Sequence, residues 1–169
     1  MRSFESEPSG VYTIATWPAI GRDTPVPMKS RQTADELLRA GLPESEPLVV
    51  LDQLKAGLPS KVLDAFKQSA RLSDEQLSQL LQVGGRTLSR ARGRSRSRLP
   101  PDLSERLFAV ASVYALAIGV FGDTETAFGW INEPQFGFAG RTPFALISSE
   151  LGRRQVSSLL QRIEHGMLA

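Results

Sequence analysis

Six arginines lie in a stretch of the chain that contains no acidic residue, between Gln76 and Pro101. They are Arg86, Arg90, Arg92, Arg94, Arg96 and Arg98. The whole chain carries a net charge of only +2, and taking these six from its 20 basic residues leaves 14 against 18 acidic ones. Guanidinium groups gathered in this way create a local positive potential that attracts polyanions, most commonly nucleic acid. The alternative is a solvated arginine–serine loop that only keeps the protein soluble.

The arginine run begins inside a predicted short helix that Leu88 would anchor to the core. With Leu88 inward, the residues facing outward and expected to contact DNA are Gly85, Arg86, Ser89 and Arg90. The planar fork of arginine matches the O6 and N7 acceptors of guanine. The later arginines alternate with glycine and serine, which suits phosphate contacts: Arg92, Arg94, Arg96 and Arg98. Six phosphate contacts would give a slope of log K against log salt of about −5. No aromatic residue interleaves the arginines to stack unpaired bases, which favours DNA over RNA.

The search for catalytic residues yields no candidate. The single histidine, His165, has no partner at metal-ligand spacing, and the chain contains no cysteine. Signatures of nucleophilic, phosphate-binding and zinc-dependent enzymes are missing from the sequence. We therefore expect a protein that is not an enzyme and needs no cofactor or metal.

The elements that would hold the arginines form a predicted helix-turn-helix from Ser73 to Arg90. Ser73 can cap the amide of Gln76, and Gln76 can reach back to Ser73 in a capping box. Leu72 and Leu77 fit the two positions of a hydrophobic staple. A turn containing glycine follows, and the second helix leads into the arginine run. In such motifs the start of the second helix enters the major groove of DNA.

Further helices are predicted on both sides of this motif, so residues 48–169 are expected to be all-α. Apolar residues recur at steps of three and four from Asp102 to Phe121, which indicates a core helix buried on most sides. Asp123 is expected to cap the next helix, and Thr142 the one that starts at Pro143. Gly152 is expected to end that helix, before a last helix that runs toward Gly166.

Three parts are expected along the chain: an N-terminal arm over residues 1–47, a DNA-binding domain over 48–121 and a C-terminal domain over 122–169. The arm carries six of the eleven prolines and is predicted either to pack partly on the body or to form a tail. The apolar stretch from Phe108 to Phe121 is shorter than the ~20 residues that cross a bilayer. Without a signal peptide or cysteine, a cytoplasmic protein is expected, with no membrane partner.

Four motifs stand in order in the second half of the chain: F-G-D ending at Asp123, Trp130 before Pro134, G-R-T-P-F from Gly140, and R-I-E-H-G from Arg162. In these motifs the chain resembles the C-terminal toxin-binding domain of Xre/MbcA/ParS-like antitoxins. The stretch from Val83 to Arg90 and the L-P-P-D-L-S-E-R-L stretch from Leu99 are similar to the Xre-type helix-turn-helix of these antitoxins. The resemblance covers about residues 48–169.

This resemblance implies an antitoxin that blocks a RES-type toxin, an NAD-consuming enzyme, and represses the operon the two share. The residues it implies for toxin binding are Trp130, Gly140, Arg141, Thr142, Pro143, Arg162, Glu164 and Gly166. For Trp130, packing in the protein core is as open an interpretation as contact with the toxin. A homodimer and a larger toxin–antitoxin complex are also expected. In one departure from the family pattern, Gly84, followed by Gly85, stands at the position where Ser or Thr usually opens the recognition helix. The alternative is a stand-alone helix-turn-helix regulator without a toxin.

Overall fold

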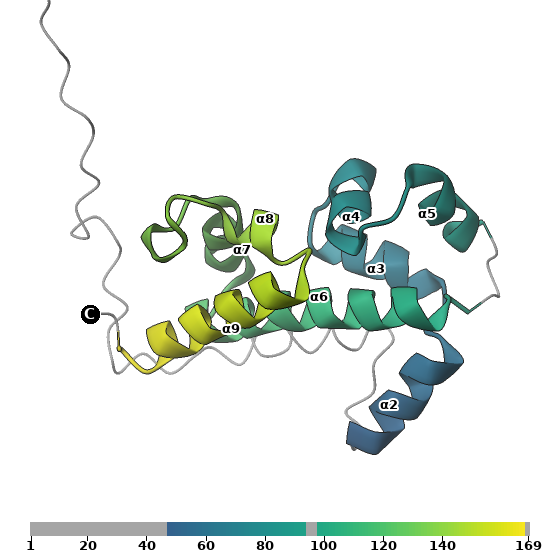
Figure 1. The fold of residues 1–169 in the computed structure, drawn as a ribbon, viewed down its shortest axis with the longest axis horizontal. Helices are drawn as coiled ribbons and strands as arrows, with labels where there is room; N and C mark the ends of the chain where they lie inside the picture. Colours follow the sequence, from purple (N-terminus) through teal and green to yellow (C-terminus); the bar gives the residue numbers. More distant parts are fainter. Residues whose placement is uncertain (1–46, 94–97, 168–169) are drawn as a thin grey trace, which may run out of the picture.

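The computed structural model describes residues 47–93 and 98–167, and these ranges form α-helices joined by short turns (Figure 1). In chain order the elements are α2 (Pro47–Ala56), α3 (Lys61–Ser69), α4 (Asp74–Leu81), α5 (Gly85–Arg92), α6 (Pro101–Phe121), α7 (Thr124–Asn132), the 3-10 turn η2 (Phe136–Phe138), α8 (Pro143–Leu146) and α9 (Glu150–Glu164). Within these ranges there is no strand, which confirms the all-α prediction. The predicted arm lies outside the described residues, except for Pro47 at the start of α2.

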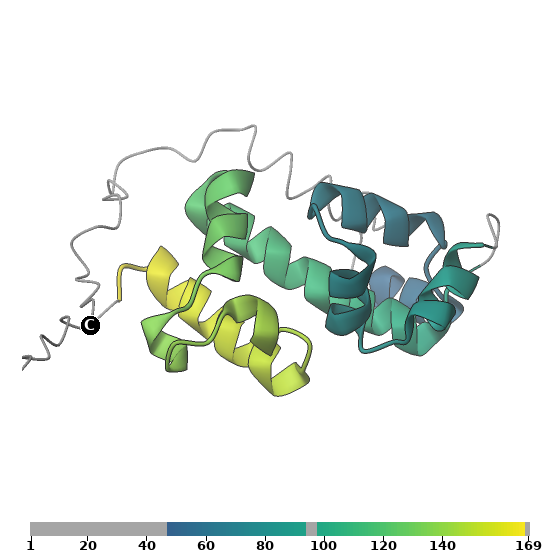
Figure 2. The same ribbon diagram turned by 90° about the horizontal axis from the view of Figure 1, so that it is seen from above.

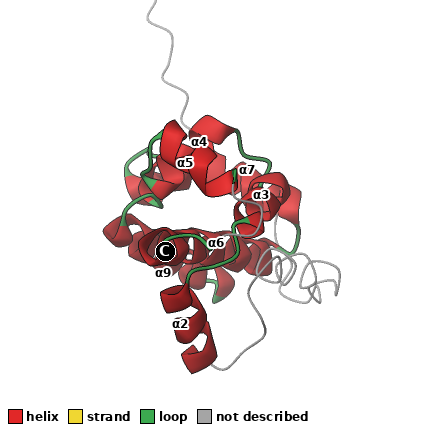
Figure 3. Cartoon of the chain, turned by 90° about the vertical axis from the view of Figure 1, so that its right-hand side faces the viewer, coloured by secondary structure: helices red, strands yellow, loops and turns green. Residues whose placement is uncertain are grey.

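Helix α6 is the central element around which the others pack. Helices α3, α4 and α5 lie on one side of one half of α6, with α2 on the opposite side (Figures 1 and 3). Helices α7, α8 and α9 cover the other half, and α9 runs beside α6 when the molecule is seen from above (Figure 2). α6 contributes its side chains to the core along its whole length. Those less than 2% exposed are Leu103, Ser104, Leu107, Val110, Tyr114, Ala117 and Ile118.

By length and composition α6 is also the one helix in the described ranges that could cross a membrane, with 21 residues and a mean hydropathy of 1.5. Inside the protein, however, 56% of its most apolar window is buried against other elements. The aromatic rings of Phe66 and Phe128 pack edge-on against Tyr114, with centroids 5.5 and 5.4 Å away. The burial and the ring contacts indicate that α6 is the central helix of the protein core.

Local capping signals start the helices where the sequence predicts. The hydroxyl of Ser73 accepts a hydrogen bond from the amide of Gln76, whose side chain accepts one in return, so the capping box is confirmed. Asp123 accepts from Thr126 at the start of α7. At the other end of α6, Gly122 adopts a φ of 82°, a backbone conformation that favours glycine.

The predicted role of Gly152 as a helix terminator is wrong. Helix α8 already ends at Leu146, and Gly152 lies in the first turn of α9, where its amide donates to the hydroxyl of Ser149. A Cβ atom at position 152 would lie only 1.9 Å from the carbonyl oxygen of Leu146. Glycine is therefore required here because the end of α8 passes directly against the backbone of α9.

Candidate DNA-binding and toxin-binding surfaces

Hydrogen bonds to backbone carbonyl oxygens fix the turn between α4 and α5. Gln82 ends α4 in the left-handed region, and Arg106 of α6 donates to the carbonyl oxygen of Leu81 at 3.1 Å. Gly84 occupies the N-cap position of α5 and has no side chain to cap with, but its carbonyl oxygen accepts from the amides of Thr87 and Leu88 at 2.9 and 3.1 Å. The double glycine therefore still supports a regular first turn of α5.

The outer face of α5 carries the residues that the sequence predicts for DNA. Leu88 is 1% exposed and anchors the helix, whereas the side of α5 away from the core exposes Gly85, Arg86, Ser89 and Arg90. Arg86 and Arg90 are four residues apart, so they lie on the same face one turn apart. Neither guanidinium forms an ion pair with an acidic residue of the ranges 47–93 and 98–167. This face therefore presents two uncompensated cations around a serine.

Arg92 points inward, unlike the prediction that it faces phosphate. Its Nη1 donates to Asp74 at 2.7 Å and its Nε lies 2.9 Å from Asp64, so the side chain joins the end of α5 to α3 and α4. The side chain of Arg92 is only 20% exposed. Lys67 also contacts Asp74, at 2.6 Å, and Lys67 and then Arg92 hold the pKa of the Asp74 carboxyl below its ordinary value of 3.8. In this structure Arg92 therefore positions α5, and its contact with phosphate stays a prediction.

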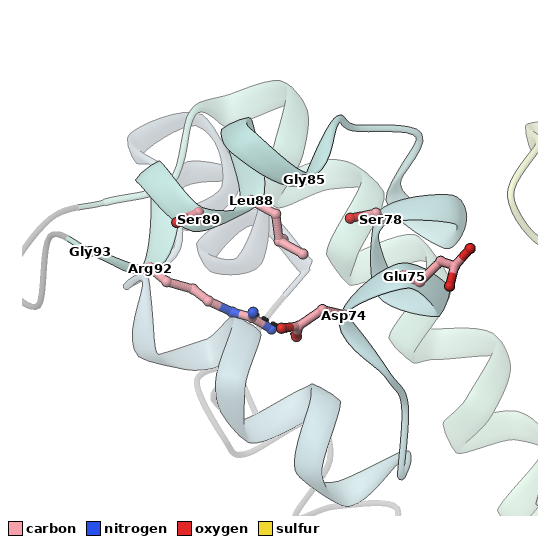
Figure 4. A pocket seen from close by; sticks show the side chains of 8 residues that line it. All are labelled: Asp74, Glu75, Ser78, Gly85, Leu88, Ser89, Arg92 and Gly93. Carbon is pink, nitrogen blue, oxygen red and sulfur yellow. Dashed lines mark hydrogen bonds and ion pairs between the residues drawn. The ribbon is translucent and has the colours of Figure 1, made fainter.

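Figure 4 shows the hollow between α4 and α5, with Leu88 at its floor and Arg92 reaching across to Asp74. Asp74 and Glu75 line the same hollow. Because its walls carry carboxylates, the hollow is unsuited to a phosphate group. Gly85 and Ser89 also line this hollow, whereas Arg86 and Arg90 do not.

The remaining arginines of the run fall into two groups. Arg94 and Arg96 lie outside the described residues. Arg98 is exposed, but its Nη1 donates to the carbonyl oxygen of Gly57 at 2.7 Å, and its backbone pairs with Pro59. Arg98 therefore helps to dock the connection before α6 onto the turn after α2, in addition to any contact with phosphate.

Trp130, predicted as a toxin contact or a core residue, belongs to the core. Its side chain is 2% exposed, and its ring centroid lies 5.5 Å from that of Phe121. Thr142 caps α8 by accepting from the amide of Ala145 at 3.2 Å, and Pro143 is buried as the first residue of that helix. Trp130 and Pro143 are thus buried inside the C-terminal domain, and the hydroxyl of Thr142 fixes the start of α8.

Gly140 and Arg141 lie on the exposed connection between α7 and α8 (Figure 1). Gly140 has a φ of 76°, and Arg141 closes the connection by accepting a hydrogen bond from the amide of Gln135 at 3.0 Å. The same connection exposes Phe136 completely, although no sequence pattern marks this residue as functional. Its only signal is an aromatic residue beside Gly137 in a glycine-rich segment.

Arg162, Glu164 and Gly166 are exposed at the end of α9. Gly166, with a φ of 65°, donates to Ile163, and the next amide donates to Arg162 at 2.9 Å, so the helix end is closed by its own backbone. In both views this end lies at the same end of the molecule as the connection between α7 and α8, and α5 lies at the opposite end (Figures 1 and 2). The predicted DNA and toxin residues therefore form two separate surfaces.

Comparison with known proteins assigns a different domain to each of these two surfaces. Residues 49–112 match the antitoxin Xre-like helix-turn-helix domain, and residues 116–166 match the antitoxin Xre/MbcA/ParS C-terminal toxin-binding domain. An antitoxin Xre of Yersinia enterocolitica is 31% identical over 130 residues, which cover 76% of this chain and 87% of that protein. The chain belongs to the Xre antitoxin family.

Two further relatives carry the same name. An antitoxin Xre of Photorhabdus laumondii is 27% identical over 117 residues, 69% of this chain and 78% of the relative. One from Pseudomonas putida is 37% identical over 68 residues, 40% of this chain and 43% of the relative. The protein is thus a non-enzymatic antitoxin with a helix-turn-helix DNA-binding domain and a C-terminal toxin-binding domain. The C-terminal match favours this assignment over a stand-alone regulator.

Proposed function

We propose that this antitoxin neutralises an NAD-consuming RES-type toxin by occluding its active site with the C-terminal domain, and represses its own operon through α5. The observation that carries the proposal is the separation of two surfaces on one molecule. The match to a toxin-binding domain covers the end that holds α7 to α9, while the unpaired arginines lie at the other end. An antitoxin built in this way can hold DNA and toxin together in the cytoplasm.

For DNA, we assign base contacts to the exposed face of α5, at Arg86, Ser89 and Arg90, with Gly85 allowing close approach of the backbone. Arg94 and Arg96 are assigned to phosphates, and Arg98 to a phosphate only at the edge of the surface, because Gly57 already holds it. Operators read by a helix-turn-helix usually mirror a two-fold axis of the protein. A homodimer follows from this rule, and a larger complex forms when each copy binds a toxin.

For the toxin, we assign direct contacts to the exposed residues of the C-terminal end: Gly140, Arg141, Arg162, Glu164 and Gly166. Trp130, Thr142 and Pro143 act indirectly, because they hold α7 and α8 in place. We divide the chain into a DNA-binding part over residues 48–121 and a toxin-binding part over 122–169, with α6 as the element that both parts pack on.

Coexpression with the toxin gene encoded beside the antitoxin tests the proposal. The full antitoxin is expected to restore growth and to purify with the toxin, whose NAD-consuming activity it suppresses. A chain that lacks residues 164–169 retains Ile163, which packs against the core, and so is expected to stay folded. It should lose growth rescue and still bind operator DNA. Growth rescue by this truncated chain would contradict the role of the tail, and a neighbouring gene that encodes no toxin would contradict the proposal as a whole.

A further inference from the structure

Phe136 is the most exposed large apolar side chain in the described part of the chain, with its surface 100% accessible. It is the first residue of η2, between α7 and α8. Single exposed apolar side chains are common on protein surfaces and need no special explanation. What sets Phe136 apart is that its backbone is fixed, so the ring is held away from the core.

The connection that carries Phe136 is closed on itself by hydrogen bonds. The amide of Gln135 donates to Arg141 at 3.0 Å, and the amide of Ala139 donates to the carbonyl oxygen of Phe136 itself at 3.0 Å. The side-chain amide of Gln135 donates to the carbonyl oxygens of Trp130 and Glu133 at 3.1 and 3.2 Å. These bonds tie the connection to the end of α7, whose Trp130 is buried.

The space beneath the connection is already filled, so Phe136 has no room to turn inward. A Cβ atom at Gly137 would lie 3.3 Å from the side chain of Leu159 in α9. Phe138, two residues along, is partly buried and packs against the core. One aromatic ring of η2 therefore faces in and the other faces solvent. Because the backbone of the connection is already fixed, little backbone freedom is lost when Phe136 enters a partner.

The position of Phe136 indicates which partner it fits. It lies within residues 116–166, which match the toxin-binding domain, and at the opposite end of the molecule from α5. Arg141 lies on the same connection, exposed and without an ion pair to any acidic residue of the described ranges. Aromatic residues and arginine are the types enriched at the energetic centres of protein interfaces. An apolar ring gives no affinity for the phosphates of DNA, and its place within the toxin-binding match favours the toxin as the occupant over a second copy of this chain.

We propose that Phe136 is the apolar anchor of the toxin interface: its ring enters a hydrophobic pocket of the cognate toxin, and Arg141 pairs with an acidic group at the rim of that pocket. The inference rests on the proposed function and adds to it a contact that the family motifs do not contain. It also gives the interface a hydrophobic centre beside the charged tail of α9.

Titration of the purified toxin from the neighbouring gene with full-length antitoxin variants tests this anchor. Phe136→Ala is expected to weaken toxin binding at least about 30-fold, the loss typical of a hot spot. Phe136→Leu should keep most of the affinity, because the pocket accepts an apolar group. Since the ring makes no contact inside the antitoxin, the melting temperature and operator affinity of Phe136→Ala should equal those of the wild type.

Leu48→Ala is the matched control, because Leu48 is also largely exposed, at 75%, but lies in α2. It should bind the toxin as the wild type does. Equal toxin affinities for the wild type and Phe136→Ala would overturn the anchor while leaving the proposed function standing, as would equal losses in Phe136→Ala and Leu48→Ala. A wild-type antitoxin that fails to bind the toxin would overturn the proposed function together with the anchor.

Discussion

The outer face of α5 and the connection between α7 and α8 both expose side chains on a rigid backbone, but the exposed side chains are cationic on α5 and aromatic on the connection. Both are held rigidly by backbone hydrogen bonds and by residues that point inward. On α5 the apolar residue is buried, with Leu88 1% exposed, and the cations face solvent. On the connection the apolar residue is the one displayed, with Phe136 100% exposed. The comparison supports the proposal that one surface binds a polyanion and the other a protein.

Replacing Leu88, the buried anchor of α5, should impair operator binding and leave toxin binding unchanged. Leu88→Ala leaves a cavity under α5 and is expected to lower the free energy of unfolding by about 2–5 kcal/mol. Operator binding should fall with it, since α5 loses its fixed orientation, while the C-terminal end keeps its toxin contacts. Thermal unfolding, a gel-shift titration and toxin binding below the unfolding temperature measure these effects. Wild-type stability in Leu88→Ala would show that α5 does not depend on this residue.

Salt should separate the two surfaces without any mutation. Arg92 is held by Asp64 and Asp74, and Arg98 is already bonded to Gly57, so four arginines of the run remain whose full charge can act on DNA: Arg86, Arg90, Arg94 and Arg96. Each protomer is therefore expected to give a slope of about −3.6 instead of −5. Operator affinity would then fall about 100-fold between 50 and 200 mM salt, whereas an interface centred on an apolar ring should change only slightly. Fluorescence anisotropy against both ligands measures the two slopes. Equal slopes would mean that the surfaces do not differ in this way.

The ion pairs of Arg92 should give a smaller effect that depends on pH. Because Lys67 and Arg92 lower the pKa of Asp74, the charged carboxylate stabilises the fold above about pH 4, and this contribution is lost as the pH falls through the lowered pKa. Arg92→Ala should therefore melt below the wild type at neutral pH, and the two proteins should converge in acid. Arg90→Ala, which removes an exposed arginine of the same helix, is the control and should not shift the melting temperature. A difference between Arg92→Ala and the wild type that persists at about pH 2 would argue against the ion pairs.

Much of the fold could be predicted because its signals are local. The capping box at Ser73, the cap at Asp123 and the left-handed glycine at position 122 each depend on residues within one turn of the helix end. The spacing around Leu88 predicted which face of α5 is exposed, because helix periodicity alone decides it. The motifs of the C-terminal half indicated the family, which the comparisons confirmed.

The features that the sequence did not reveal depend mostly on contacts between residues distant in the chain. Arg92 belongs by sequence to the arginine run, but its partner Asp64 lies 28 residues earlier, on α3. Gly152 is required because two helices approach closely there. A glycine that ends a helix looks the same in the sequence, so the sequence cannot distinguish the two roles. Phe136 carries no periodic signal, since the direction of its ring is set by the hydrogen bonds of a short connection.

The most direct test of two independent surfaces is to measure both affinities on one altered protein, Arg86→Ala/Arg90→Ala. Each arginine that reads a guanine contributes roughly 1–3 kcal/mol of discrimination, so the double variant is expected to lose at least about 30-fold in preference for its operator. Its affinity for the toxin should equal that of the wild type. Unchanged operator preference, or a parallel loss of toxin binding, would contradict the account.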